Sequence, residues 1–119
     1  MTGPSLRLTP PPPLEFRLHE PATGVVSLEV VGEVDLATAG QLIAEAARAL
    51  AEQRPSRLEI DLAGVAFLDS TGINALMTTW RAAREAGCEV VVTNPRGPIA
   101  RILVITGVAA HLGLPGAEL

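Results

Sequence analysis

Residues 58–93, LEIDLAGVAFLDSTGINALMTTWRAAREAGCEVVVT, decide the fold because their hydrophobic period changes twice. Leu58, Ile60 and Leu62 alternate with less apolar residues, which indicates a strand. A three-to-four spacing then indicates an amphipathic helix, and Gly87 is placed to end it as a left-handed C-cap. The apolar run Cys88–Thr93 predicts a further strand, buried on both faces. Two strands joined by a helix pair in parallel through a right-handed crossover. The apolar stripe of the helix consists of Ile73, Leu76, Met77, Trp80 and Ala83.

The residues before this unit predict a hairpin and a second helix. Apolar and polar residues alternate over Leu14–His19, as expected of an outer strand, and Pro21–Gly24 predicts a turn. Val25–Val34 is the second predicted strand. From Asp35 the period becomes helical, so we expect a helix from about Ala37 to the residues before Pro55. Its apolar stripe comprises Leu36, Ala39, Leu42, Ile43, Ala46 and Leu50.

The C-terminal part predicts one short helix and a final turn. Pro98 lies in the first turn of a helix over Pro98–Thr106, Gly107 lies just past its end, and a turn follows near Ala109–Leu112. We therefore predict a single α/β domain over residues 14–114, in which a mixed sheet of four to five strands, an initial hairpin and then parallel βαβ units, packs with about four helices. The predicted core includes Leu28, Val30, Leu42, Ile43, Ile60, Leu62, Leu76 and Val91.

Length and composition bound the class of protein. The chain has 119 residues, 48% of them hydrophobic, and a formal net charge of -4, which is typical of one soluble globular domain. Residues 1–13, with the run Pro10–Pro13, are expected to form a flexible leader, and residues 115–119 a short tail. A single cysteine, Cys88, and the lack of a signal-peptide pattern favour a cytoplasmic location. The apolar runs are far shorter than the ~20 residues of a membrane span.

The residue inventory excludes several kinds of chemistry. All nine basic residues are Arg, so no lysine is present for a phosphate-binding loop or a Schiff base. The acidic balance and the absence of tyrosine argue against a nucleic-acid partner. His19, His111 and Cys88 are too few and too far apart in sequence for a zinc site. We therefore expect neither a metal nor a cofactor.

The strongest local feature is Phe67–Ile73, where an apolar strand end passes into a helix start. Asp69, Ser70 or Thr71 is suited to be the N-cap of that helix. A single cap explains neither three successive small polar residues nor Gly72 in the first turn, where glycine costs about 1 kcal/mol relative to alanine. An exposed hydroxyl at this point faces the positive end of the helix dipole, so a phosphate on Ser70 is also compatible with the pattern. From the residues alone the cap is the better interpretation, because every helix needs a start signal.

Catalytic interpretations are weaker. Glu59 and Asp61 share one face of a strand and are suited to be an acid/base pair, but the solvent-facing side of an alternating strand explains them better. Ser70 lacks the first glycine of a nucleophile elbow, since Leu68 stands there. A catalytic triad at Ser70 requires His19 or His111, which are distant in sequence.

Three stretches together resemble the STAS domain family, and specifically its stand-alone bacterial anti-sigma factor antagonists. They are Gly32–Ala39, Asp61–Gly72 and Arg101–Val108. The resemblance implies that Ser70 is the serine that an anti-sigma factor kinase phosphorylates. It also implies that Asp35 and Thr38 correspond to the acidic and hydroxyl residues of the family's first loop. Where the family usually has glycine, two residues after the motif glycine, this chain has Asn74.

What the resemblance implies is a protein switch and not an enzyme. The unphosphorylated form binds an anti-sigma factor serine kinase and releases the sigma factor. Phosphorylation of Ser70 ends the binding, and a serine phosphatase resets it. The expected partner-binding residues are Asp35, Thr38, Asp69, Thr71, Gly72 and Asn74. Two alternatives to the switch stay open. The first is a STAS protein that binds constitutively, either as a scaffold in a stress-signalling complex or as a subunit of a lipid-transport ATPase. The second and weaker one is a hydrolase that uses Ser70.

Overall fold

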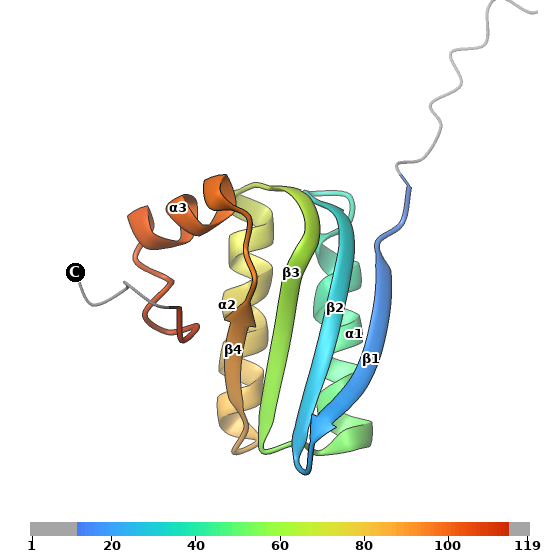
Figure 1. Ribbon diagram of the computed structural model, residues 1–119. Helices are drawn as coiled ribbons and strands as arrows, with labels where there is room; N and C mark the ends of the chain where they lie inside the picture. Colours follow the sequence, from blue (N-terminus) through green and yellow to red (C-terminus); the bar gives the residue numbers. More distant parts are fainter. Residues whose placement is uncertain (1–11, 115–119) are drawn as a thin grey trace, which may run out of the picture.

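Four strands and three helices alternate along residues 12–114, the part of the chain that the computed structural model describes (Figure 1). The predicted flexible leader, apart from its last two residues, and the predicted tail lie outside the described residues. The elements in chain order are β1 (Glu15–Ala22), β2 (Val25–Val34), α1 (Ala39–Gln53), β3 (Arg57–Leu68), α2 (Ser70–Glu85), β4 (Glu89–Thr93) and α3 (Gly97–Ile105).

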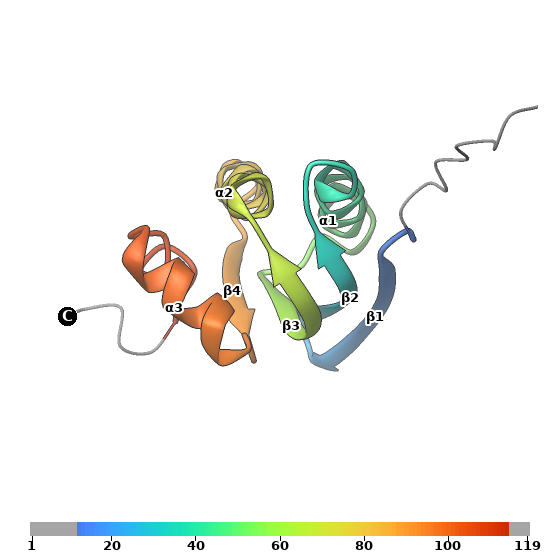
Figure 2. The ribbon, with the colours of Figure 1, turned by 90° about the horizontal axis from the view of Figure 1, so that it is seen from above.

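The strands form one mixed sheet in the order β1-β2-β3-β4. The β1–β2 pair is an antiparallel hairpin, whereas β2–β3 and β3–β4 are parallel. Helices α1 and α2, which make the two crossovers, lie side by side on one face of the sheet (Figure 2). Helix α3 lies beside the β4 edge. The predicted hairpin followed by parallel βαβ units is confirmed, and the predicted last turn near Ala109–Leu112 stays a turn.

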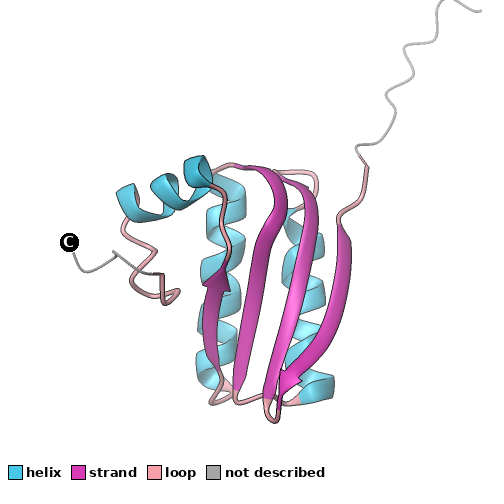
Figure 3. Ribbon diagram, viewed as in Figure 1, coloured by secondary structure: helices cyan, strands magenta, loops and turns pink. Residues whose placement is uncertain are grey.

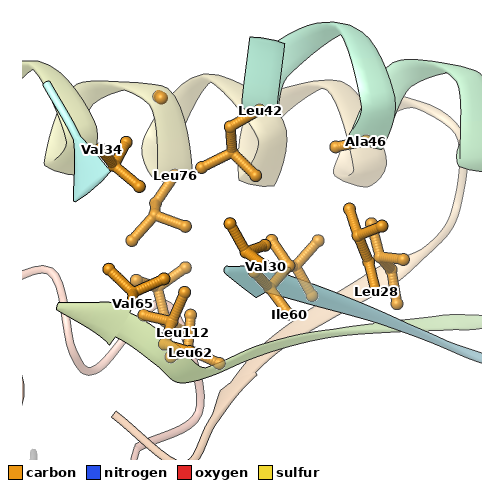
Figure 4. Packing of buried hydrophobic residues seen from close by; sticks show 14 of the residues in the cluster. Leu28, Val30, Val34, Leu42, Ala46, Ile60, Leu62, Val65, Leu76 and Leu112 are labelled. Atoms are coloured by element: carbon orange, nitrogen blue, oxygen red, sulfur yellow. The ribbon is translucent and has the colours of Figure 1, made fainter. Parts of the chain in front are cut away.

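Figure 3 shows the strands and helices by colour. The core fills the space between the sheet and the two crossover helices, as the close-up in Figure 4 shows. Six of the eight predicted core residues are buried, and two are only half-buried. Ile43 lies at the flank of α1, beside the buried row of that helix. Val91 points away from the helices because its neighbours Val90 and Val92 point toward them. The prediction that β4 is buried on both faces is therefore wrong, since no helix of the described residues covers its outer face.

Helix ends follow the predicted signals closely. Gly87 and Gly107, just beyond α2 and α3, have φ of 74° and 80°, the left-handed conformation that glycine adopts at little cost. The helix expected from about Ala37 begins two residues later, at Ala39, because the preceding residues form a tight turn. No helix within residues 12–114 has the length and apolarity to cross a membrane.

Replacing Leu42 by Ala tests this assignment of the core. Leu42 is fully buried on the sheet-facing side of α1, so Leu42→Ala should lower the free energy of unfolding by about 2–5 kcal/mol. Leu18→Ala is the control, because Leu18 is 45% exposed on β1 and should cost far less. Urea denaturation measures both values. Equal losses in the two variants would contradict the assignment.

Candidate functional site

The two loops that carry the predicted site residues meet at one edge of the sheet. Strands β2 and β3 are parallel, and Val34 pairs with Leu68 at their carboxyl ends. The next residues along the chain, Asp35 and Asp69, therefore leave the sheet side by side. The backbone N–H of Asp69 donates to the carbonyl oxygen of Val34 at 3.3 Å, which joins the two loops directly. Segments about 30 residues apart in sequence thus form one surface at the upper end of the sheet in Figure 1.

The first loop is a turn closed by its own side chains. An Asp35 carboxylate oxygen accepts hydrogen bonds from the backbone N–H groups of Ala37 and Thr38, at 3.0 and 3.2 Å. The Thr38 hydroxyl donates to the carbonyl oxygen of Glu33 at 2.6 Å and accepts from the N–H of Asp35 at 3.0 Å. Thr38 is buried, so we assign it to positioning the turn and not to direct contact with a partner.

The second loop shows which residue begins α2. Asp69 is the N-cap: one of its carboxylate oxygens accepts from the N–H groups of Thr71 and Gly72, at 2.9 and 3.2 Å, and from the Thr71 hydroxyl. The pKa of the Asp69 carboxyl is lowered, chiefly because the Thr71 hydroxyl bonds to its charged form; the two backbone bonds add to this effect, and partial desolvation opposes it. Asp69 and Thr71 therefore supply the cap together.

Ser70 takes no part in capping α2, because Asp69 and Thr71 make the cap. It is the first residue of α2, its side chain is exposed, and its hydroxyl has no hydrogen-bond partner among residues 12–114. Asn74 is also exposed and lies one turn further along, so the two side chains share one side of the helix. A free hydroxyl thus stands at the positive end of the helix dipole.

Gly72 is buried, and what approaches it closely is this chain's own sheet. A β-carbon at this position would lie 2.8 Å from Cγ of Leu68 and 3.2 Å from the carbonyl oxygen of Val34. Glycine therefore lets the first turn of α2 pack directly on the ends of β2 and β3. The close approach that Gly72 permits is therefore made within the molecule.

Two exposed apolar side chains flank the site and were not among the predicted site residues. Leu36 is 83% exposed between Asp35 and the buried Thr38, and Phe67 is 47% exposed at the end of β3. The helical period counted Leu36 as part of the α1 stripe, which is wrong because the helix begins after it. Alternation predicts that Phe67 and the buried Leu68 face opposite sides, but it does not show which of them is covered.

The alternative catalytic groupings do not assemble. A Glu59 carboxylate oxygen lies 3.6 Å from the Arg57 guanidinium, and an Asp61 carboxylate oxygen accepts from the N–H of Ala63 at 2.9 Å. Both carboxylates are therefore engaged in local interactions along β3. His19 pairs with Glu29 at 3.6 Å, and the His111 ring packs against Trp80 at a tilt of 55°, with centroids 4.7 Å apart; neither contacts Ser70. Burial raises the pKa of the Cys88 thiol, which lies just before β4, so the predicted strand Cys88–Thr93 begins one residue later, at Glu89. Residues 12–114 contain no grouping of His, Cys, Asp and Glu that could hold a metal.

A family profile and a curated relative both match most of this chain. The sequence profile described as "Mlab, STAS domain" matches residues 19–115. An anti-sigma-B factor antagonist of Listeria monocytogenes is 26% identical over 105 residues, which cover 88% of this chain and 91% of the relative.

Solved structures agree with this. The crystal structure of an anti-sigma factor antagonist from Mycobacterium paratuberculosis superposes with a TM-score of 0.68 and 32% identity, over 86% of this chain and 83% of that one. The Bacillus cell fate determinant SpoIIAA in its phosphorylated form superposes with a TM-score of 0.62 and 18% identity, over 81% and 86% of the two chains. At 18% identity that likeness shows the fold.

Substitution of Gly72 tests the packing that positions the site. Gly72→Ala should lower the free energy of unfolding by about 1–3 kcal/mol, because the added methyl overlaps Leu68 and the backbone of Val34. Gly40→Ala in α1 is the matched control: nothing lies within 4 Å of its new methyl, so stability should be unchanged or slightly higher. Thermal unfolding of both variants measures the difference, and a harmless Gly72→Ala would contradict the packing.

The pH dependence of Asp69 tests the cap. Because folding lowers the pKa of this carboxyl, its charged form stabilises the native state above the ordinary value of 3.8, and this contribution disappears as the pH falls through the lowered value. Asp69→Asn keeps a capping side chain but no charge. The melting temperature of the native protein should exceed that of Asp69→Asn by a constant amount near neutral pH, and the gap should close below about pH 4. A gap independent of pH would contradict the assigned role.

Proposed function

The chain belongs to the STAS domain family, and we propose that it acts as an anti-sigma factor antagonist controlled by phosphorylation of Ser70. In the unphosphorylated state it binds an anti-sigma factor that is a serine kinase, and the sigma factor is released. The kinase transfers a phosphoryl group to the Ser70 hydroxyl, and the binding ends. A serine phosphatase restores the hydroxyl. The chain itself performs no catalysis in this scheme.

The observation that carries the proposal is that Asp69 caps α2 and leaves the neighbouring Ser70 exposed. Helix α2 is capped by Asp69 with help from Thr71, so the Ser70 hydroxyl has no structural task. Its side chain is exposed at a surface formed by two loops. A kinase can therefore reach the hydroxyl, and the fold can accept a phosphate there, without breaking any hydrogen bond of the described residues.

Electrostatics explains why a phosphate would end the binding. Phosphorylation adds about -1.5 to -2 charges at neutral pH. The neighbouring Asp69 carboxylate already accepts from the N–H groups of Thr71 and Gly72, so the phosphate cannot take over these helix donors. The new charge therefore remains at the surface, next to Asp69 and close to the Asp35 loop. A partner that fits the neutral hydroxyl must then desolvate a dianion or move away.

The residues proposed to contact the partner surround Ser70 and are exposed, apart from the half-buried Asp35. Asp35 and Asn74 supply polar groups, and Leu36 and Phe67 supply apolar surface of the kind that anchors interfaces. Asp69, Thr71, Thr38 and Gly72 hold the two loops and the helix start in place. Asn74, which stands where the family usually has glycine, is proposed to affect affinity for the particular partner.

A constitutive STAS scaffold or subunit is the alternative, and the profile description "Mlab, STAS domain" does not separate it from the switch. Ser70 favours the switch because a phosphorylatable hydroxyl stands exposed at the start of α2 and takes no part in the cap. The two functions differ in a measurable way. A scaffold binds its partner whether or not Ser70 carries a charge.

Ser70 variants test the proposal. After co-expression with each candidate anti-sigma kinase of the same genome, intact-mass analysis should detect one phosphate on the native chain and none on Ser70→Ala. Ser70→Ala should bind that kinase like the unphosphorylated protein, and Ser70→Asp should bind at least tenfold more weakly in calorimetric titrations. Because Asp69 is the cap, both variants should keep the native stability within about 0.5 kcal/mol.

Three results would contradict the proposal. A phosphate located on Thr71 with Ser70 unmodified would assign the switch to the wrong residue. Equal affinity of Ser70→Asp and the native chain for the kinase would favour the scaffold. A loss of about 1 kcal/mol in Ser70→Ala would mean that the serine serves the cap.

A further inference from the structure

Helix α3 is apolar apart from Arg101, and its apolar side chains are only partly covered. Ile99 and Leu103 are buried against the domain. Three further large apolar residues of the same nine-residue helix are exposed: Ile102 by 37%, Val104 by 43% and Ile105 by 75%. An amphipathic surface helix normally carries polar residues at such positions. Apolar side chains gathered on an exposed helix mark a surface that a partner covers.

The charge around α3 differs from that of the rest of the molecule. The chain has a net charge of -4, yet no acidic residue occurs between Glu89 and Glu118. Arg96 and Arg101 are the basic residues of this stretch. The Arg96 side chain donates to the carbonyl oxygen of Ala63 at 3.1 Å, whereas Arg101 is exposed on α3 beside the apolar residues. The outer surface of α3 is thus apolar with one positive charge.

This surface lies at the same end of the domain as the start of α2. Figure 1 shows α3 beyond the upper end of β4, level with the first turn of α2. Between α3 and β4, Val104 lines a groove of about 460 Å³ together with Val91, Pro95 and Leu114. The half-buried Val91 is therefore part of an apolar groove and not of the core. A concave apolar groove beside a helix suits a segment of another protein.

We propose that the outer surface of α3, defined by Arg101, Ile102, Val104 and Ile105, is a second docking surface for the anti-sigma factor that engages Ser70. This inference rests on the proposed function. The segment of the partner that covers α3 presents apolar side chains and a carboxylate opposite Arg101. On the other side of Ser70 the same partner meets Glu33 and Asp35, so it must be basic there. An interface of two opposite charges fixes the orientation of the partner.

Two other occupants fit the surface less well. Electrostatic docking to an anionic membrane uses clusters of about four to eight basic residues, and α3 offers Arg101 with Arg96 already bonded to Ala63. A second copy of the chain, packed through α3 about a two-fold axis, would bring Arg101 close to its own symmetry mate, which is unfavourable. Both remain outcomes of the test below.

The test uses the full chain and the kinase that phosphorylates it in the co-expression experiment. Ile105→Gln and Arg101→Glu should each weaken binding of the unphosphorylated protein to that kinase by at least tenfold in calorimetric titrations. The controls make the same chemical changes on β1: Leu18→Gln alters a residue of 45% exposure, and Arg17→Glu reverses an exposed charge. These controls should change the affinity less than twofold. Circular dichroism should show that all four variants are folded.

Ser70→Asp, measured in parallel, separates the two proposals. If Ser70→Asp binds weakly while both α3 variants bind like the native chain, the second docking surface is wrong and the proposed function stands. If Ser70→Asp binds like the native chain, the proposed function fails, and the inference that rests on it fails as well.

Two further measurements test the other occupants of the α3 surface. Light scattering that shows a dimer, and its loss in Ile105→Gln, would assign α3 to self-association. Sedimentation with phosphatidylglycerol vesicles that Arg101→Glu abolishes would assign it to a membrane. Either result overturns the inference.

Discussion

The close contact between the first turn of α2 and the ends of β2 and β3 is the constraint on which the site depends. Gly72 makes it possible, because a β-carbon there would overlap Leu68 and crowd Val34. Once α2 starts this close to the sheet, the N–H of Asp69 reaches the carbonyl of Val34, and the two loops are held side by side. The surface around Ser70 is thus a consequence of backbone packing.

Capping by Asp69 explains how the proposed modification site can lie at a helix start without weakening the helix. Loss of an N-cap costs a helix about 0.5–2 kcal/mol, and here the cap is Asp69, supported by the Thr71 hydroxyl. Ser70 lies between these two residues in sequence but takes no part in the cap. On the proposed function, this separation lets charge be added and removed at Ser70 while the fold stays unchanged. A switch of this kind acts on the surface and needs no conformational change.

Much of the fold could be predicted because the local signals agree with each other. Periods of two and of three to four residues locate the strands and helices, and Pro55, Gly87 and Gly107 mark the helix ends. The errors have a common physical cause. Val91, Ile43 and Leu36 are apolar, but their burial depends on which neighbour covers them, and period alone does not contain that information. The helices cover one face of the sheet, so Val91 is half-buried. The turn at Asp35 delays the start of α1, so Leu36 is exposed.

For the site, sequence reasoning could place Ser70, Asp35 and Asp69 at one edge, since both loops follow parallel strands. It could not choose the cap among Asp69, Ser70 and Thr71, because all three residue types cap helices well. The central claim is that phosphate on Ser70 ends partner binding and leaves the fold intact. The most direct measurement compares stoichiometrically phosphorylated and dephosphorylated protein, in affinity for the anti-sigma kinase and in amide hydrogen exchange of α2. We predict an affinity at least a hundredfold lower for the phosphorylated form, with unchanged protection of α2. Equal affinities, or loss of protection in α2 on phosphorylation, would contradict the account.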